Sequence, residues 1–564
     1  MIKKIISVII TGLFVGTLVA LLVQFFLNSA DFLTTHFRKN YDDINFEDDY
    51  SYFTFFIYFF AIPVFIGVLV GIIRNLNKDK RWHGPPDVIL SVHQDSKELN
   101  IKSGFLTTIA SILSISVGSS VGQYGPLVHF GGTIGAEIKK LFSFAPDFKI
   151  LVSAGVASAI SSGFGAPLAG LIFAREVILR HQSLASFAPI LVASVVSYLF
   201  TKNIFGMDPI FEGSVGEINS LYDFPFFIIA GIVCGFVSII YMNGLTHSKY
   251  FPNISFINPV LQPAIAGLIC GIMSIFLPEV IGLGTGAIQS MILGNVEFIY
   301  AIYFLIFKLL LTIICLRMGL IGGVFAPALF LGASVGVILG FIFQNLSPTL
   351  DLNLLTVASM SAFASCVIGG PVANMMIILE LTSDYQATLV AGVSIVFASL
   401  ISYKVIGQSV FDKVLLNKNI DLKVGRENIK LQQIPVSEIS HKDYCSLQPN
   451  FTVEQSINTM IKSKKSESYL VDDNEKLLNK FELHQLLGEK NKKKKILQLH
   501  TSKFLKLYSE TNIFESIEQS KDFVGESIPI VSKQNKIYGV ISEGDLFQIF
   551  LKITKEEKEL ENKD

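Results

Sequence analysis

Residues 118–135 read GSSVGQYGPLVHFGGTIG, and residues 319–336 read GLIGGVFAPALFLGASVG. When the first stretch is moved by 201 positions, four of its glycines fall on glycines of the second and its proline falls on a proline. Tyr124 falls on Phe325 at the same shift. Similarity within one chain at a fixed spacing indicates a duplicated structural unit.

A second pair of stretches follows the first in each half. GAPLAGLIFAREV at 165–177 matches GGPVANMMIILEL at 369–381 at a shift of 204 positions, which places Glu176 on Glu380. The order of the two stretches is the same in both halves. We therefore predict two related units, at approximately 50–205 and 225–415.

The composition is that of a membrane protein. Hydrophobic residues make up 51% of the chain and charged residues only 16%, whereas soluble domains carry about 25% charge. Long apolar runs fill residues 1–417, and residues 418–564 read as ordinary polar globular sequence. We predict a polytopic membrane domain at 1–417 and a soluble domain at 418–564.

Charge and cysteine usage exclude several classes of protein. A net charge of −1 indicates no nucleic-acid partner. The five cysteines are scattered without CxxC spacing, so we expect neither a disulfide framework nor a metal site. The chain contains no Walker loop, HExxH or GxSxG motif. We therefore expect no enzyme activity and no required cofactor.

Positive charges at the first two apolar runs predict the orientation in the membrane. The run after Lys3 and Lys4 is too long for a signal peptide and reads as the first membrane helix. The second run, at 52–73, is followed by Arg74, Lys78, Lys80 and Arg81. Positive residues stay on the cytoplasmic side, so we expect cytoplasmic N- and C-termini. As the location we expect a bacterial inner membrane.

The glycines and prolines interrupt an apolar segment at matching places in both halves. Such interruptions are typical of broken helices that form a binding site at the interface of two repeats. A helix that starts after the loop directs unpaired N–H groups and a partial positive charge at an anion. The alternative is that these glycines only allow helices to pack closely.

The combination of GQYGP, GVFAP, GFGAPLAGLIFAREV and HGPPDV resembles the CLC chloride channel and transporter family. PAIAGLICGIMSIFLPEVIGLGTGAIQ and PVANMMIILELTSDY resemble it as well, and the polar tail is similar to a pair of CBS modules. The resemblance implies an all-α polytopic membrane protein of two inverted repeats with broken helices, followed by a cytosolic α/β CBS pair. It also implies a homodimer with one chloride path in each subunit.

The resemblance assigns residues to a central anion site. Val324 and Phe325 match the positions whose backbone N–H groups coordinate chloride in the family. His83 and Gly84, in WHGPP, match a motif that commonly carries a serine, and Phe411 stands where a tyrosine is common. A histidine can donate hydrogen bonds and make anion affinity depend on pH. The alternatives are a structural histidine at a helix end and simple packing of the phenylalanine.

The first loop departs from the family pattern. Where the family has a glutamate that serves as gate and proton carrier, this chain has Tyr124, flanked by Gln123, where a basic residue is common, and by Gly125. A glutamate side chain titrates near pH 4.3 and a phenol near pH 10. Tyrosine can block a path or donate its hydroxyl to an anion, but it cannot repeat the proton cycle of a carboxylate.

A second acid of the coupled exchangers is also missing. The resemblance places an inner proton-transfer glutamate at Val177, which cannot carry a proton. Glu176 is an acid inside the membrane, and such acids are functional candidates. Its counterpart Glu380 favours a structural role, the capping of backbone amides.

Both replacements predict passive conduction of chloride or a similar anion without proton coupling. One alternative is a slow or unusually coupled anion transporter. The other is a nucleotide sensor with a vestigial pore.

The polar tail contains a repeat of its own. Two stretches share a pattern of helix, strand, turn and strand, and Val471 falls on Val531 at a shift of 60 positions. The pattern fits two CBS modules, at approximately 433–489 and 498–553. Ser542 and Asp545, in ISEGDL, are the candidates for binding an adenine nucleotide. The first module has Gln485 at the matching position, so we expect at most one such site. The alternative is a module that stabilises a dimer and binds no ligand.

Overall fold

The computed structural model divides into two compact units, Met1–Lys418 and Asn419–Asp564. We call them the membrane unit and the tail unit, and each is described by itself. The sequence predicts a domain boundary between residues 417 and 418, one residue before this division. The structure describes residues 2–38, 49–94, 99–142, 146–180, 184–206, 216–246, 257–407, 409–418, 420–422, 430–432, 434–499 and 503–563.

The regular elements of the membrane unit are all helices among its described residues. Its first half contains α1 (Ile2–Phe37), α2 (Asp49–Phe56), α3 (Ile62–Leu76), α4 (Pro85–His93), α5 (Ile101–Ser116), α6 (Tyr124–Leu141), α7 (Phe148–Phe164), α8 (Pro167–Phe173) and α9 (Leu184–Phe205). Its second half contains α10 (Phe224–Thr246), α11 (Gln262–Phe276), α12 (Thr285–Ile292), α13 (Phe298–Arg317), α14 (Phe325–Phe343), α15 (Leu352–Ile368), α16 (Pro371–Thr382) and α17 (Tyr385–Val405), and α18 (Val410–Leu416) follows.

Helix length and composition agree with a polytopic membrane protein. Among the described residues, seven helical segments are long and apolar enough to cross a membrane. Several shorter apolar helices, including α7 and α15, lie among them. Helices too short to span are the expected result where a membrane segment is broken into two pieces.

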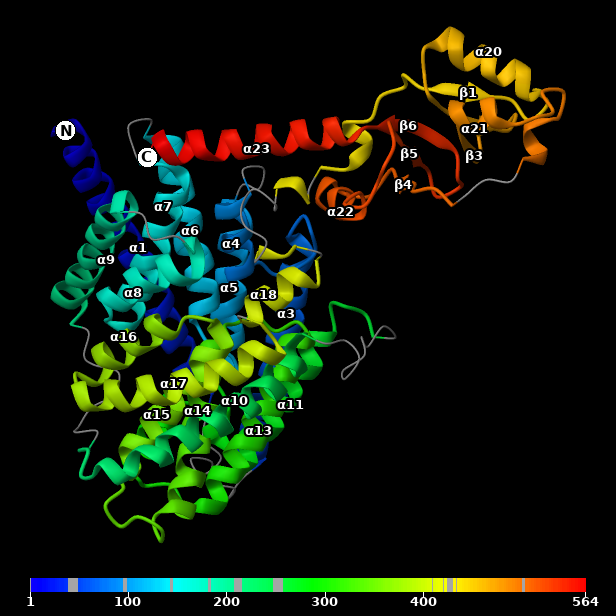
Figure 1. The fold of residues 1–564 in the computed structure, drawn as a ribbon. Coiled ribbons are helices and arrows are strands. Elements are labelled where there is room, and N and C mark those ends of the chain that lie inside the picture. The colour runs from blue at the N-terminus through cyan, green and yellow to red at the C-terminus, as the bar shows by residue number, and fades with distance from the viewer. Residues whose placement is uncertain are drawn as a thin grey trace. The chain divides into compact units, whose positions relative to one another are not determined.

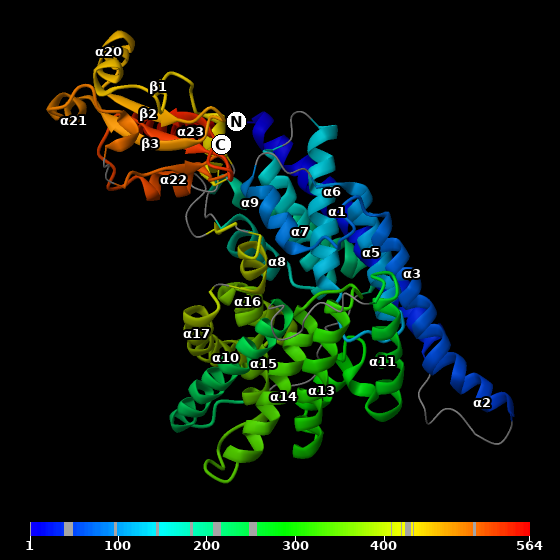
Figure 2. The ribbon, with the colours of Figure 1, turned by 90° about the vertical axis from the view of Figure 1, so that its right-hand side faces the viewer.

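The two halves repeat one packing pattern. Helix α6 packs on α7 as α14 packs on α15, and α1 packs on α9 as α10 packs on α17. Figures 1 and 2 show the blue-to-cyan first half stacked against the green-to-yellow second half. The predicted fold class, an inverted-repeat membrane protein with broken helices, is confirmed.

The two glycine-rich loops meet each other at the centre. Gly122 and Gly323, which are equivalent positions of the repeat, form an antiparallel bridge. The Gly122 N–H donates to the Gly323 carbonyl over 2.6 Å, and the Gly323 N–H donates back to the Gly122 carbonyl. An antiparallel pairing between equivalent residues requires a local two-fold axis between them. The bridge is therefore consistent with the predicted inverted repeats.

Both sequence interpretations of the glycines apply, but to different glycines. Gly122 and Gly323 lie in the loops, where each backbone approaches the other. Further along, Gly131 and Gly135 of α6 lie directly against backbone carbonyls of α7. A Cβ at any of these positions would collide with backbone. The loop glycines allow the bridge, and the helix glycines allow close packing.

The halves also cap one another through the matched acids. The Glu176 carboxylate accepts from the N–H groups of Val372 at 3.2 Å and Ala373 at 2.8 Å, at the start of α16. The Glu380 carboxylate accepts from Leu168 and Ala169 at the start of α8, both at 2.8 Å. A carboxylate satisfies the unpaired N–H groups of a helix start and favours its partial positive charge.

The tail unit contains two small sheets of the same design. The first module has β1 (Cys445–Leu447), α20 (Val453–Ser463), β2 (Glu467–Val471), β3 (Leu477–Glu482) and α21 (Leu483–Gly488). The second has β4 (Leu507–Tyr508), α22 (Ile513–Gln519), β5 (Ile528–Val531), β6 (Ile537–Ile541) and α23 (Glu543–Lys563). In each sheet the first pair of strands is parallel and the second antiparallel. This arrangement is consistent with the predicted CBS pair, although residue 433, where the first module was expected to begin, lies outside the described residues.

A buried polar cluster joins the two modules. Lys480 and Glu467 form an ion pair of 2.8 Å with side chains only 7% and 5% exposed. Glu467 also accepts from the Ser527 N–H at 2.9 Å, and Lys480 donates to the Ser527 carbonyl at 2.9 Å. Ser527 belongs to the second module. The ion pair of the first module therefore holds the two modules together through its hydrogen bonds to Ser527.

We expect Glu467→Gln to loosen the contact between the modules. The change keeps the size of the side chain but leaves the Lys480 ammonium buried without a counter-charge, which costs about 3 kcal/mol. Hydrogen exchange of the full-length protein should show faster exchange in β2, β3 and β5. Glu518→Gln, at an exposed position of α22, is the matched control. Unchanged protection in the Glu467 variant would contradict this account.

Candidate anion pathway

A cavity of about 410 Å³ lies where the broken helices of the two halves meet. We call it the first cavity. Equivalent residues of the repeat face it in pairs: Tyr124 with Phe325, Phe164 with Ile368, and Phe173 with Ile377. The other residues that line it are Pro85, Pro86, Gly125, Val128, Ile160, Leu245, Thr246, Leu316, Arg317, Gly322, Gly323, Val324, Val410, Phe411 and Val414.

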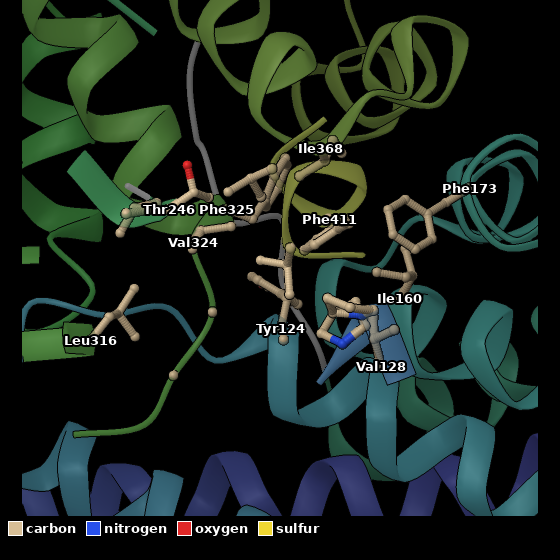
Figure 3. Close-up of a pocket in the computed structure, with 18 of the residues that line it drawn as sticks. Tyr124, Val128, Ile160, Phe173, Thr246, Leu316, Val324, Phe325, Ile368 and Phe411 are labelled. Carbon is tan, nitrogen blue, oxygen red and sulfur yellow. The ribbon is translucent and has the colours of Figure 1, made fainter. Parts of the chain in front are cut away.

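Tyr124, the first residue of α6, is fixed on the wall of this cavity. Its ring stacks on Phe164 with centroids 3.5 Å apart and meets Phe325 edge-on at 6.1 Å. Its hydroxyl donates to the Gly163 carbonyl at 3.1 Å, and the side chain is buried. Figure 3 shows Tyr124, Phe325 and Phe411 around the same space. Both ends of the tyrosine are therefore held.

The start of α14 presents backbone donors at the cavity. Val324 and Phe325 line it, and in the described part of the chain neither N–H donates to a carbonyl or to a capping side chain. The Tyr241 hydroxyl lies 3.4 Å from the Val324 carbonyl and restrains that peptide from behind. Unpaired N–H groups at a helix start are suited to hold an anion.

Phe411, in α18, lines the cavity with its ring and supplies no donor. The polar side chains on the wall are those of Tyr124, Thr246 and Arg317 among the described residues. Arg317, at the end of α13, donates to the Gly244 carbonyl at 3.2 Å. It is the charged group of the wall in the described chain, and its charge is positive.

His83 and Gly84 do not reach the cavity wall, which is formed by the following Pro85 and Pro86. Gly84 caps α4, and its N–H donates to the Asp87 carboxylate at 3.0 Å. The His83 nitrogens lie 4.0 Å from carboxylate oxygens of Asp79 and Asp87. The structure therefore places Pro85 and Pro86, and not His83 and Gly84, at the wall of the first cavity, and the anion-site role of these two residues stays a prediction.

The three predicted gate residues separate in space. Tyr124 and Gly125 line the first cavity, whereas Gln123 lines a second cavity of about 440 Å³. The bridge between Gly122 and Gly323 lies beside all three. Consecutive residues of one loop therefore face two cavities.

Val177 and Glu176 lie in a π-helical turn at Ala174–Leu179. Val177 is buried, and its side chain packs against Gly370. Glu176 is engaged with the start of α16, as described above. Neither residue lines the first cavity.

In the tail unit, Ser542 and Asp545 bind each other. The Asp545 carboxylate accepts from the Ser542 hydroxyl at 2.6 Å and from its N–H at 2.9 Å, and so caps α23. Burial opposes ionisation, but these hydrogen bonds and the neighbouring His441 hold the pKa of Asp545 below its usual value. The nucleotide site stays a prediction.

Phe164 and Arg317 are among the residues of the first cavity that the sequence analysis did not single out. Phe164 precedes the matched GAP stretch by one residue, and extending the shift of 204 positions backwards would have paired it with Ile368. Arg317 ends an apolar helix and carries no motif signal.

Comparison with known proteins places this fold and cavity in a family. Residues 64–403, more than half of the chain, match the family described as "Voltage gated chloride channel". The voltage-gated ClC-type chloride channel ClcB of Salmonella typhimurium is 27% identical over 349 residues, which cover 60% of this chain and 83% of that protein. ClcB of Shigella flexneri is 25% identical over 329 residues, covering 57% and 78%.

Solved structures share the fold. A slow cyanobacterial Cl−/H+ antiporter superposes with a TM-score of 0.65 at 22% identity, over 73% of this chain and 98% of that one. A eukaryotic CLC transporter covers 97% of this chain and 99% of that one, with a TM-score of 0.63 at 15% identity. Together with the match over residues 64–403, the fold shows that this chain belongs to the voltage-gated chloride channel family of membrane anion channels and transporters.

Proposed function

We propose that this chain conducts chloride or a similar small anion passively, without moving protons in exchange. One observation carries the proposal. Among the described residues, no carboxylate and no histidine lines the first cavity, and the gate position holds a tyrosine. A group that exchanges protons must titrate in an accessible pH range, and an ordinary phenol, with a pKa near 10, does not.

The residue at position 177 gives a second, independent reason to expect no proton exchange. Val177 stands where the resemblance implies a proton-transfer acid, and its buried aliphatic side chain has no proton to exchange. The neighbouring Glu176 carboxylate accepts two backbone N–H groups of α16. Its protonation would leave that helix start less well satisfied, so this acid supports the fold rather than a relay.

The cavity retains what an anion needs. Unpaired N–H groups at Val324 and Phe325 and the positive Arg317 favour a negative ion. The surrounding wall is largely aliphatic and aromatic, which strengthens these interactions because water is displaced. A cation would lose its hydration there and gain no acidic ligand.

Tyr124 serves in this proposal as a steric gate. The stacking on Phe164 and the hydrogen bond to Gly163 hold the ring across the wall of the cavity. An ion passes when both contacts break together. Conduction is accordingly limited by the motion of one side chain.

Further properties implied by the family belong to this proposal. They are a homodimeric assembly, cytoplasmic termini in an inner membrane, transport rather than enzyme chemistry, and a regulatory tail that binds an adenine nucleotide or no ligand.

Proton coupling is tested in liposomes that contain the purified protein. Chloride flowing down its gradient should drive no uphill proton movement, because the path lacks both exchangeable acids. The measurement is the external pH during valinomycin-triggered chloride efflux, with protein-free liposomes as the control. Proton uptake that follows chloride efflux would refute passive conduction and favour a coupled transporter.

The gate is tested by Tyr124→Ala. Removing the ring eliminates one stacking contact and one hydrogen bond, together worth about 1–2 kcal/mol, so we expect chloride flux to rise about 5- to 30-fold. Tyr124→Phe, which loses only the hydroxyl, should rise by less than about 5-fold. An unchanged rate in the alanine variant would show that Tyr124 is not the gate.

The tail is tested by a chain that ends at Asn417. Because all the described residues that line the first cavity belong to the membrane unit, passive flux should persist in liposomes. An effect of added adenine nucleotide on the full-length protein that disappears in the shortened chain would assign the tail a regulatory role. Loss of flux in a shortened protein that remains monodisperse would favour a sensor on which conduction depends.

A further inference from the structure

The second cavity lies on the other side of the gate loop from the first. Gln123 faces it, while the next residue, Tyr124, faces the first cavity. Its remaining wall comes from the end of α1, from Ile115 of α5 and from residues 278–287. The chain around Gly122, which forms the bridge to Gly323, therefore contributes residues to both walls.

Arg38, at the end of α1, is the arginine of this wall. Its guanidinium lies over two glycines: a Cβ on Gly118 would be 3.5 Å from Nε, and one on Gly282 would be 3.0 Å from Nη1. The glycines are themselves joined, because the Gly282 N–H donates to the Gly118 carbonyl at 3.0 Å. Both have positive φ, 82° and 61°, which favours glycine. The guanidinium therefore lies against two backbone positions that carry no side chain.

The Arg38 guanidinium has no acidic partner in the described parts of the chain. Asp31 and Glu279 also line the cavity, but both are exposed. Neither carboxylate lies within 4.0 Å of the Arg38 guanidinium. A second cation supports the same loop from below. Lys308 is fully buried and donates to the carbonyls of Val280 at 2.9 Å and Gly282 at 2.8 Å.

The matching loop of the second half offers an internal comparison. Gly319, the equivalent of Gly118, is also covered by an arginine, Arg74. There the guanidinium donates to the Pro259 carbonyl. Arg74 is therefore used in holding the chain, whereas Arg38 lines a cavity and donates to no such carbonyl among the described residues.

We propose that the second cavity binds a small inorganic anion, such as a halide, at Arg38. The positive charge that the family motif commonly places at Gln123 is supplied here by a residue of α1, with Lys308 fixing the loop on which it rests. An anion held at Arg38 lies next to Gln123, one residue from the gate. The proposal rests on the proposed function, because the bound anion is the one that would next pass Tyr124.

Bromide is the probe for a direct test. Crystals of the full-length protein grown in bromide should show anomalous density beside Arg38 in the second cavity. In Arg38→Gln that density should disappear, while any density beside Val324 and Phe325 stays. Arg38→Lys, which keeps the charge, should retain the second-cavity density at reduced occupancy. Density confined to the first cavity in the wild type would overturn the proposal and leave the proposed function standing.

Tracer chloride exchange, with equal chloride on both sides of the membrane, supplies a functional readout. Loss of the charge should raise the half-saturating chloride concentration of Arg38→Gln about 3- to 10-fold, with the maximal rate unchanged. Lys102→Gln removes a charge from an exposed position at the start of α5 and should change neither value. An unchanged half-saturating concentration in Arg38→Gln would overturn the proposal. Bromide at Arg38 together with proton-coupled flux would instead uphold the site and refute passive conduction.

Discussion

The bridge between Gly122 and Gly323 is the contact on which the rest of the membrane unit depends. It pairs equivalent residues of the two halves, and α6 and α14 begin within two residues of it. Two helix starts, each with unpaired N–H groups and a partial positive charge, are thereby brought to one cavity. The residues that follow Gly122 divide between that cavity, which Tyr124 lines, and the second cavity, which Gln123 lines.

The exchange of caps between Glu176 and Glu380 gives two intramembrane acids a structural role, which is what the proposed function requires of them. Each carboxylate accepts from two N–H groups of a helix in the other half. The interaction is symmetric, as the bridge is. The glycine bridge and the carboxylate caps both hold the two halves together. Neither interaction needs an ionisable group that lines the first cavity.

Much of this architecture is predictable from local signals. Glycine and proline place the starts of α6 and α14, and the repeat pairs Tyr124 with Phe325. Which cavity each side chain lines depends on contacts between the two halves, and local signals do not predict those contacts. Gln123 lines a different cavity from Tyr124, and His83 stays off the wall of the first cavity although the nearby Pro85 and Pro86 line it. Arg317 and Arg38 reach the cavities from helix ends that carry no motif.

The central claim is that the anion path has kept its helix-start donors and lost its proton carriers. Its most direct test is the reversal potential of the full-length protein in a planar bilayer with a fixed chloride gradient and an imposed pH gradient. The account predicts a reversal potential set by chloride alone and unchanged when the pH gradient is inverted. A reversal potential that shifts with the pH gradient would contradict it.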